Sequence, residues 1–250
     1  MRVFSPAYIT TLLVTAVAAT TLCVAGRRRA AASPARWVVV ANWVLAAALL
    51  VTSALWLEST YVGQPFTAAN SLPFALCDVA ALVAAAGLVT RRPILVELTY
   101  FWGLAGTLQA LLTPDLQVGW PSLEFVEYVV AHAAVVCAAL FLVVGQRLVP
   151  RPRAVRRIWL VTLAYTAFVG ILDAATGGNY MYLRHVPPEW TLLSVLGPWP
   201  WYLLSAAAVA LVLFTLLDLP FWAGRRSVVL PPNRPGRGGM AHAAGARPTP

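Results

Sequence analysis

Ionisable side chains inside long apolar segments are the residues of this sequence whose chemistry stands out. Cys77 and Asp78 are adjacent, and His132 lies in another apolar segment. A thiol becomes a nucleophilic thiolate when a base takes its proton, and a carboxylate can orient a histidine that acts as this base. We therefore interpret Cys77 as a candidate nucleophile, His132 as its base, and Asp78 or Asp173 as the orienting acid.

Other polar side chains near the ends of these segments are candidates for binding a substrate. The amides of Gln109 and Asn179 can donate hydrogen bonds to an oxyanion that develops during acyl transfer. A loop near residue 180 adds two tyrosines and an arginine. The substrate-binding candidates are Gln109, Asn179, Tyr180, Tyr182 and Arg184.

Each candidate also has a purely structural interpretation. A single cysteine such as Cys77 is commonly a small buried apolar residue. Asp78 can pair with Arg184, and His132 can make a structural hydrogen bond. Tyr180 and its neighbour Tyr182 can be aromatic residues of the membrane interface.

The composition is typical of a chain embedded in a bilayer. The 250 residues are 60% hydrophobic and 11% charged, whereas a soluble domain has about 25% charged residues. A transmembrane helix needs about 20 mostly apolar residues. Seven segments meet this requirement: 6–25, 37–57, 72–90, 93–112, 124–144, 158–176 and 199–222. We predict an all-α, polytopic transmembrane bundle of seven helices over residues 1–222, followed by a disordered basic tail over 223–250.

The arginines predict the orientation of this bundle. All 18 basic residues are arginines, and only Arg2 and Arg184 lie outside alternate connections and the tail. An excess of basic residues in short loops marks the cytoplasmic side. We therefore predict a multi-pass protein of the inner (plasma) membrane with its N-terminus outside and its tail in the cytoplasm. Near the predicted cytoplasmic ends, Glu97 and Asp218 are expected to pair with the flanking arginines, which are Arg91, Arg92, Arg225 and Arg226.

This orientation places the beginnings of the third and fifth helices near the outer surface. Cys77, Asp78 and His132 would then converge in the outer leaflet with Gln109, Asp173 and the loop near residue 180. Helix contacts are assumed in this prediction.

The composition also excludes several classes of site. The chain has no lysine, which excludes a retinal or pyridoxal Schiff base and a P-loop. Its three cysteines have no paired metal-ligand spacing, so we expect no zinc site and no cofactor. The net charge of +9 favours anionic lipid headgroups over nucleic acid. The expected partners are membrane lipids and an acyl-chain or small-molecule substrate.

Several stretches of the sequence suggest a family. They are LPFALCD at 72–78, ELTYFWGLAGTLQALLTPDL at 97–116, GNYMYL at 178–183 and LGPWPWY at 196–202. Together they resemble the YwaF-type family of bacterial integral membrane proteins, over residues 40 to 222. That family is distantly similar to a eukaryotic transmembrane acyltransferase that moves fatty acyl chains between phospholipids and uses a cysteine. Relatives often carry a histidine where this chain has Ala75, which leaves His132 as the histidine available within a predicted span.

Three functions therefore fit the sequence. The first is a lipid acyltransferase or hydrolase with a Cys/His site in the outer leaflet. The second is a proton-coupled transporter of a small solute, in which the same acids carry protons. The third is a non-catalytic membrane scaffold or sensor whose polar cluster stabilises the bundle.

Overall fold

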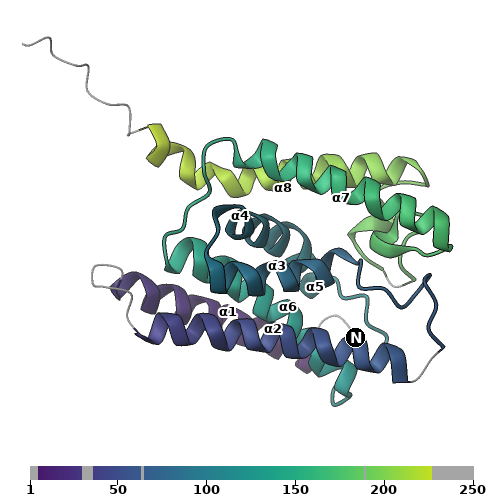
Figure 1. The fold of residues 1–250 in the computed structure, drawn as a ribbon, viewed down its shortest axis with the longest axis horizontal. Helices are drawn as coiled ribbons and strands as arrows, with labels where there is room; N and C mark the ends of the chain where they lie inside the picture. Colours follow the sequence, from purple (N-terminus) through teal and green to yellow (C-terminus); the bar gives the residue numbers. More distant parts are fainter. Residues whose placement is uncertain (1–4, 30–35, 63–64, 189, 227–250) are drawn as a thin grey trace, which may run out of the picture.

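The chain is an all-helical bundle, which confirms the predicted fold class (Figure 1). The structure is a computed structural model that describes residues 5–29, 36–62, 65–188 and 190–226. Within these ranges, six helices are long and apolar enough to cross a membrane, and a seventh apolar helix is shorter. The main helices are α1 (Pro6–Arg29), α2 (Arg36–Val62), α3 (Leu76–Thr90), α4 (Pro93–Trp102), α5 (Leu108–Leu112), α6 (Leu123–Leu140), α7 (Ala154–Thr176) and α8 (Trp201–Arg226).

Two of the spans contain a π-helical turn. The turn η1 (Gly103–Thr107) joins α4 to α5, so that the three elements form one span. The turn η2 (Phe141–Gly145) continues α6. Such turns rotate the residues that follow them relative to a regular helix, and they are frequent at functional sites.

The short helix is the third one. The sequence predicts a helix from residue 72, but α3 begins at Leu76 because the preceding Ala75 is extended, with ψ at 147°. Its 15 residues span about 22 Å at 1.5 Å per residue, less than the about 30 Å of a hydrocarbon core. Arg91, in a left-handed conformation, then ends the helix and turns the chain toward Pro93 in the first turn of α4.

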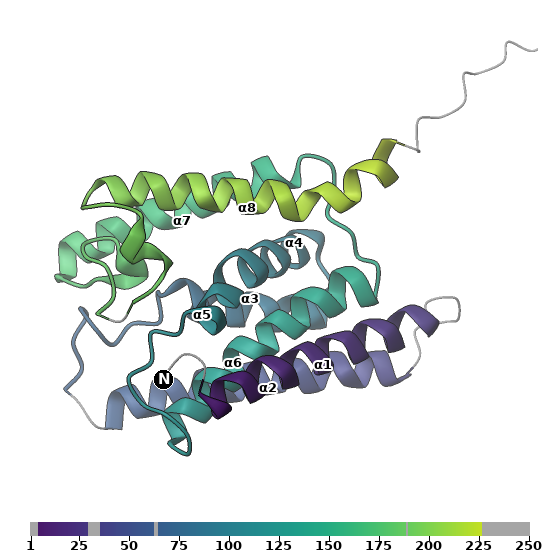
Figure 2. The same ribbon diagram turned by 180° about the vertical axis from the view of Figure 1, so that it is seen from behind.

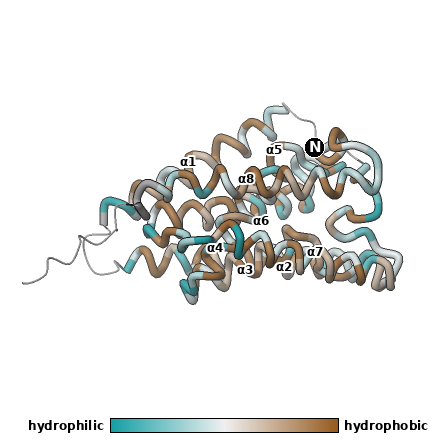
Figure 3. The backbone as a smooth tube through the Cα atoms, turned by 90° about the horizontal axis from the view of Figure 1, so that it is seen from above, coloured by the Kyte–Doolittle hydropathy of each residue, from teal (hydrophilic) through white to brown (hydrophobic). Residues whose placement is uncertain are grey.

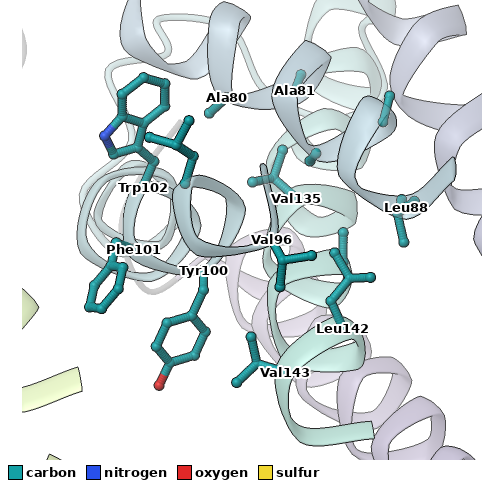
Figure 4. Close-up of a cluster of buried hydrophobic side chains, with 14 of the residues drawn as sticks. Ala80, Ala81, Leu88, Val96, Tyr100, Phe101, Trp102, Val135, Leu142 and Val143 are labelled. Atoms are coloured by element: carbon teal, nitrogen blue, oxygen red, sulfur yellow. The ribbon is translucent and has the colours of Figure 1, made fainter. Parts of the chain in front are cut away.

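The helices lie in three layers, with α3, α4 and α6 in the middle (Figures 1 and 2). Helices α1 and α2 cover one side of this layer, and α7 and α8 cover the other. Figure 4 shows the core between the central helices, where Ala80, Phe101 and Leu142 are fully buried. Small side chains such as Ala80 let the helices approach closely.

Hydrophobic residues, brown in Figure 3, recur along the outer helices. Many of their large apolar side chains are exposed. Val17 in α1, Val44 in α2, Ile171 in α7 and Leu204 in α8 are all more than half exposed. We expect these faces to contact lipid chains, because soluble proteins rarely expose continuous apolar faces of this extent. The chain is therefore a multi-pass membrane protein.

Buried Glu97, in α4, has different partners from those predicted. Its carboxylate accepts five hydrogen bonds: three from Arg151, through the main-chain N–H, Nε and Nη2, and two from Arg157, through Nε and Nη2. These distances lie between 2.8 and 3.0 Å. The prediction of a structural, arginine-paired carboxylate is confirmed, but its partners flank the start of α7 and are neither Arg91 nor Arg92. The segment before α7 folds back over this end of α4, a contact that local sequence does not reveal.

The last helix continues past its candidate membrane span, which is Trp201–Trp222. Helix α8 extends to Arg226, four residues past the predicted end of the membrane domain at 222. The Trp222 indole donates to Asp218 Oδ2 at 2.8 Å. The rest of the predicted disordered tail, from residue 227, lies outside the described residues, as does Arg2.

Candidate functional site

A cavity of about 840 Å³ lies where the first turns of α3 and α6 meet α5 and the loop before α8. Its deeper wall is mainly apolar and includes Ala81, Val135, Trp159 and Leu213. Five of the residues singled out from the sequence line this cavity: Cys77, Asp78, Gln109, His132 and Tyr182. The structure thus brings the candidate nucleophile and base to one apolar-walled space.

Cys77 lies at the second residue of α3. The first N–H groups of a helix have no partner within it, and the helix dipole there favours negative charge. N–H groups near the thiol can donate to an oxyanion. The preceding segment is held in place, because the Tyr165 hydroxyl donates to the Phe74 carbonyl oxygen at 2.8 Å.

His132 lies in α6, where one of its ring nitrogens has a defined partner. Its Nδ1 is 2.7 Å from the Tyr128 carbonyl oxygen. A carbonyl oxygen only accepts hydrogen bonds, so Nδ1 carries the proton and Nε2 of the neutral ring keeps a lone pair. That lone pair is what a general base requires.

The imidazole is also held by its neighbour. The rings of Tyr128 and His132 stack with centroids 4.0 Å apart. The Tyr128 hydroxyl in turn donates to the Ala110 carbonyl oxygen at 2.7 Å. The sequence assigned the orientation of the imidazole to Asp78 or Asp173, whereas the structure gives this contact to the main-chain carbonyl of Tyr128.

The loop before α8 closes the polar end of the cavity. The Tyr182 hydroxyl donates to Asp115 Oδ2, and both residues line the cavity. Burial, and then the hydrogen bond to Asp115, raise the pKa of Tyr182 above its usual value, so the phenol stays protonated at neutral pH. The Tyr202 hydroxyl donates to the main-chain oxygen of Tyr182 and ties the loop to α8.

Four of the sequence-predicted site residues do not line the cavity. Asp173 Oδ1 accepts from the Tyr180 main-chain N–H at 2.9 Å, and Asn179 Oδ1 accepts from the Arg184 main-chain N–H at 2.9 Å. The Tyr180 hydroxyl accepts from Leu72 N–H and donates to a nearby carbonyl oxygen. Arg184 Nη1 donates to the carbonyl oxygen of residue 178 at 3.4 Å. These contacts shape the loop beside the cavity.

Among the polar residues of the cavity wall that sequence reasoning missed are Glu127, Asp115 and Thr107. Glu127 Oε1 and Thr107 Oγ1 are buried and have no hydrogen-bond partner within the described part of the chain. Glu127 was detectable, because its spacing of three residues puts it on the same helical face as Glu124. Thr107 ends the turn η1, and no sequence signal announces a π-helical turn.

The residues that the structure describes contain no group of three or more His, Cys, Asp or Glu side chains arranged to hold a metal ion.

Comparison with known proteins gives one family and one relative. Residues 3–218 match the model of the TMEM164 family. An uncharacterized protein of Treponema pallidum (strain Nichols) is 30% identical over 152 residues, which are 61% of this chain and 63% of that protein. This chain thus spans less than two thirds of the length of that relative. No solved structure matches the chain.

Proposed function

We propose that this chain, which belongs to the TMEM164 family, transfers or hydrolyses fatty acyl groups of membrane lipids with Cys77 as nucleophile. The observation that carries this proposal is the shared cavity of Cys77 and His132, which come from different helices. Apolar walls suit an acyl chain, and polar groups beside the thiol suit an ester carbonyl. The resemblance to a phospholipid acyltransferase that uses a cysteine points to the same chemistry.

The reaction divides into two steps that this chain's residues can carry. His132 Nε2 takes the thiol proton, and the Cys77 thiolate attacks the ester carbonyl carbon of a lipid. The ester C–O bond breaks, the lipid hydroxyl leaves with the proton from Nε2, and a thioester remains on Cys77. Gln109 and the N–H groups of the first turn of α3 donate to the oxyanion.

The second step regenerates the thiol. A hydroxyl of an acceptor lipid loses its proton to His132 Nε2 and attacks the thioester carbonyl carbon. The C–S bond breaks, and the proton passes from Nε2 to the Cys77 sulfur. With an acceptor lipid the result is acyl transfer, and with water in its place the result is hydrolysis.

The arrangement of the arginines supports the proposed orientation. Cys77 begins α3 and Arg91 follows its last residue, so the cavity and the arginine-rich connections lie at opposite ends of this helix. Arg151 and Arg157 gather with Glu97 at the arginine end. With that end in the cytoplasm, the cavity opens in the outer leaflet of the cell membrane.

The packing beyond the cavity favours an enzyme over a proton-coupled transporter. A transporter needs a path that reaches the other side of the bundle. Toward the arginine end, the central helices meet through the completely buried side chains Ala84, Ala138 and Leu142, which belong to one continuous apolar core.

The covalent step can be tested with a chain that keeps only one thiol. The double variant Cys23→Ser/Cys137→Ser retains Cys77, and the matched triple variant adds Cys77→Ser. After exposure to phospholipid, intact-mass spectrometry should find an acyl adduct on the double variant that neutral hydroxylamine removes. The triple variant should carry no adduct and have no acyl-transfer or hydrolytic turnover.

The same variants separate the competing functions. A transporter predicts that Cys77→Ser is tolerated while Asp78→Asn blocks solute uptake, and a scaffold predicts that neither change alters any turnover. Either pattern contradicts the enzyme, as does an adduct that persists without Cys77.

A further inference from the structure

One threonine hydroxyl in the cavity wall lacks the hydrogen bond that threonines in helices usually make. Thr107 lines the cavity and is 2% exposed, and its Oγ1 has no partner within the part of the chain that the structure describes. A threonine hydroxyl in a helix commonly donates to the carbonyl oxygen of the preceding turn. Thr99, earlier in the same span, donates in this way to the Leu95 carbonyl oxygen at 2.7 Å. Buried polar atoms are nearly always hydrogen-bonded, so the Thr107 hydroxyl is available to a ligand atom.

The π-helical turn η1 explains why Thr107 lacks this partner. In a regular helix, the carbonyl one turn before a residue lies four positions back, and for Thr107 this carbonyl belongs to Gly103. Here the Gly103 carbonyl oxygen accepts the main-chain N–H of Leu108, which is the five-residue spacing of a π-helix. The π register moves the carbonyl away from its usual place beside the Thr107 side chain, and the hydroxyl stays uncommitted.

The same turn lies between the helices that carry the candidate nucleophile and the candidate base. A Cβ placed on Gly106 would lie 3.2 Å from Cδ2 of Leu76, the first residue of α3. A Cβ placed on Gly103 would lie 3.1 Å from the Ala139 Cβ in α6. The turn can therefore approach both helices only because these two residues have no side chain. Thr107 follows Gly106, so its place in the wall is beside the start of α3.

We propose that Thr107 is a catalytic residue whose hydroxyl donates to the oxyanion formed when Cys77 attacks an ester carbonyl. This inference rests on the proposed function, and it adds a side-chain donor to the N–H groups of α3. Oγ1 keeps its proton while the sulfur–carbon bond forms and the carbonyl π electrons move to oxygen. The charged oxygen is a stronger acceptor than the neutral carbonyl. A donor that is already in place and uncommitted stabilises this charge without breaking another hydrogen bond.

Two reagents that react with the same thiol test this role, because only one of them forms an oxyanion. A p-nitrophenyl ester of a fatty acid acylates Cys77 through a tetrahedral oxyanion, whereas iodoacetamide alkylates it by direct displacement of iodide. Both are applied to the full-length Cys23→Ser/Cys137→Ser protein in detergent, and time-resolved intact-mass spectrometry gives both rates. Thr107→Val keeps the shape of the side chain, so it should leave alkylation unchanged. It should slow acylation by about 10²- to 10³-fold, the usual loss for one oxyanion donor. Thr107→Ser should restore most of the acylation rate.

The matched control is Thr99→Val, which removes a hydroxyl from the same span at a fully buried residue outside the cavity wall. Both of its rates should stay near those of the parent. Acylation of Thr107→Val within about tenfold of the parent overturns the inference. Equal slowing of both reactions overturns it too, because alkylation needs no oxyanion donor. Should Thr107→Val not fold, Thr107→Ala compared with Thr107→Ser gives the same test.

Failure of this inference differs from failure of the proposed function. A parent that is acylated at Cys77 as fast without the Thr107 hydroxyl as with it contradicts the donor alone. A parent that iodoacetamide alkylates but that no ester acylates contradicts the proposed reaction, and the donor with it.

Discussion

The two ends of this bundle differ in how many hydrogen bonds they provide to a buried glutamate. At the arginine end, the Glu97 carboxylate accepts five hydrogen bonds from Arg151 and Arg157. At the cavity end, Glu127 is nearly as buried, yet Oε1 has no partner in the described parts of the chain. The chain thus neutralises Glu97 with its own arginines, whereas it leaves an oxygen of Glu127 available to a ligand.

The neighbouring elements explain this contrast. Around Glu97, Arg151 before α7 and Arg157 in the first turn of α7 bring two guanidinium groups to one carboxylate, each with two nitrogens. Around Glu127, the cavity wall offers tyrosine hydroxyls instead, and those of Tyr128 and Tyr182 are already committed to the Ala110 carbonyl and to Asp115. A saturated carboxylate fixes the fold, whereas an unsaturated one beside a cavity is a candidate for ligand binding.

The largest expected effect concerns the base at the cavity end. In His132→Asn, the amide can still donate to the Tyr128 carbonyl oxygen, but no lone pair replaces that of Nε2. We expect acylation of Cys77 to slow by about 10²- to 10⁴-fold, the usual range for loss of a general base. The rate of adduct formation by time-resolved intact-mass spectrometry measures this effect.

A matched change outside the cavity controls for the loss of a histidine. His185→Asn alters an imidazole that does not line the cavity and that lies 3.0 Å from the Asn179 amide. Its acylation rate should stay near that of the parent. A rate for His132→Asn within tenfold of the parent would remove the base from the mechanism.

The second prediction compares the two glutamates directly by stability. Glu97→Gln leaves two arginines without their shared anion, so we expect the free energy of unfolding to fall by about 3 kcal/mol. Glu127→Gln removes no ion pair, and its effect should be about 1 kcal/mol or less, of either sign. Unfolding of both variants in the same detergent measures the difference. Equal losses of unfolding free energy in the two variants would contradict the proposed difference between the two glutamates.

The sequence predicts the fold of this chain better than its site. Apolar segments and Pro93 mark the helices, because hydropathy and proline geometry are local properties. The pairing of Glu97 with Arg151 joins residues 54 positions apart, and it depends on a fold-back that no local pattern encodes.

Within the candidate site, spacing predicts only what lies on one helix. Glu124, Tyr128 and His132 share a broad face of α6 by their spacing of four residues. Whether Asp173 reaches the same cavity depends on the path of the loop that follows α7, and the structure gives its Oδ1 to the Tyr180 N–H instead. Successive spans run in opposite directions, so α3 and α6, which are separated by one span, both begin at the cavity end. This order brings Cys77 and His132 to the same cavity, but their roles remain predictions.

The smallest expected effect concerns Tyr182, which closes the cavity end without an ion pair. Because its pKa is raised above the unfolded value of about 10, by burial first and the Asp115 hydrogen bond second, the folded chain holds the phenolic proton more tightly than the unfolded chain. The resulting stability is fully present below about pH 10 and is lost as the pH rises through the folded pKa. Tyr182→Phe should therefore cost about 1 kcal/mol at neutral pH, and the gap to the parent should narrow above pH 10.

Unfolding of the two proteins across this alkaline range measures that gap. Asp115→Asn is the control, because it keeps an acceptor oxygen but removes the charge that helps to raise the pKa of Tyr182, so its stability should decline less steeply above pH 10 than that of the parent. A gap between parent and Tyr182→Phe that stays constant or widens with pH would mean that the phenol is not held by this contact. The cavity end would then lack the closure by tyrosines that distinguishes it from the arginine end.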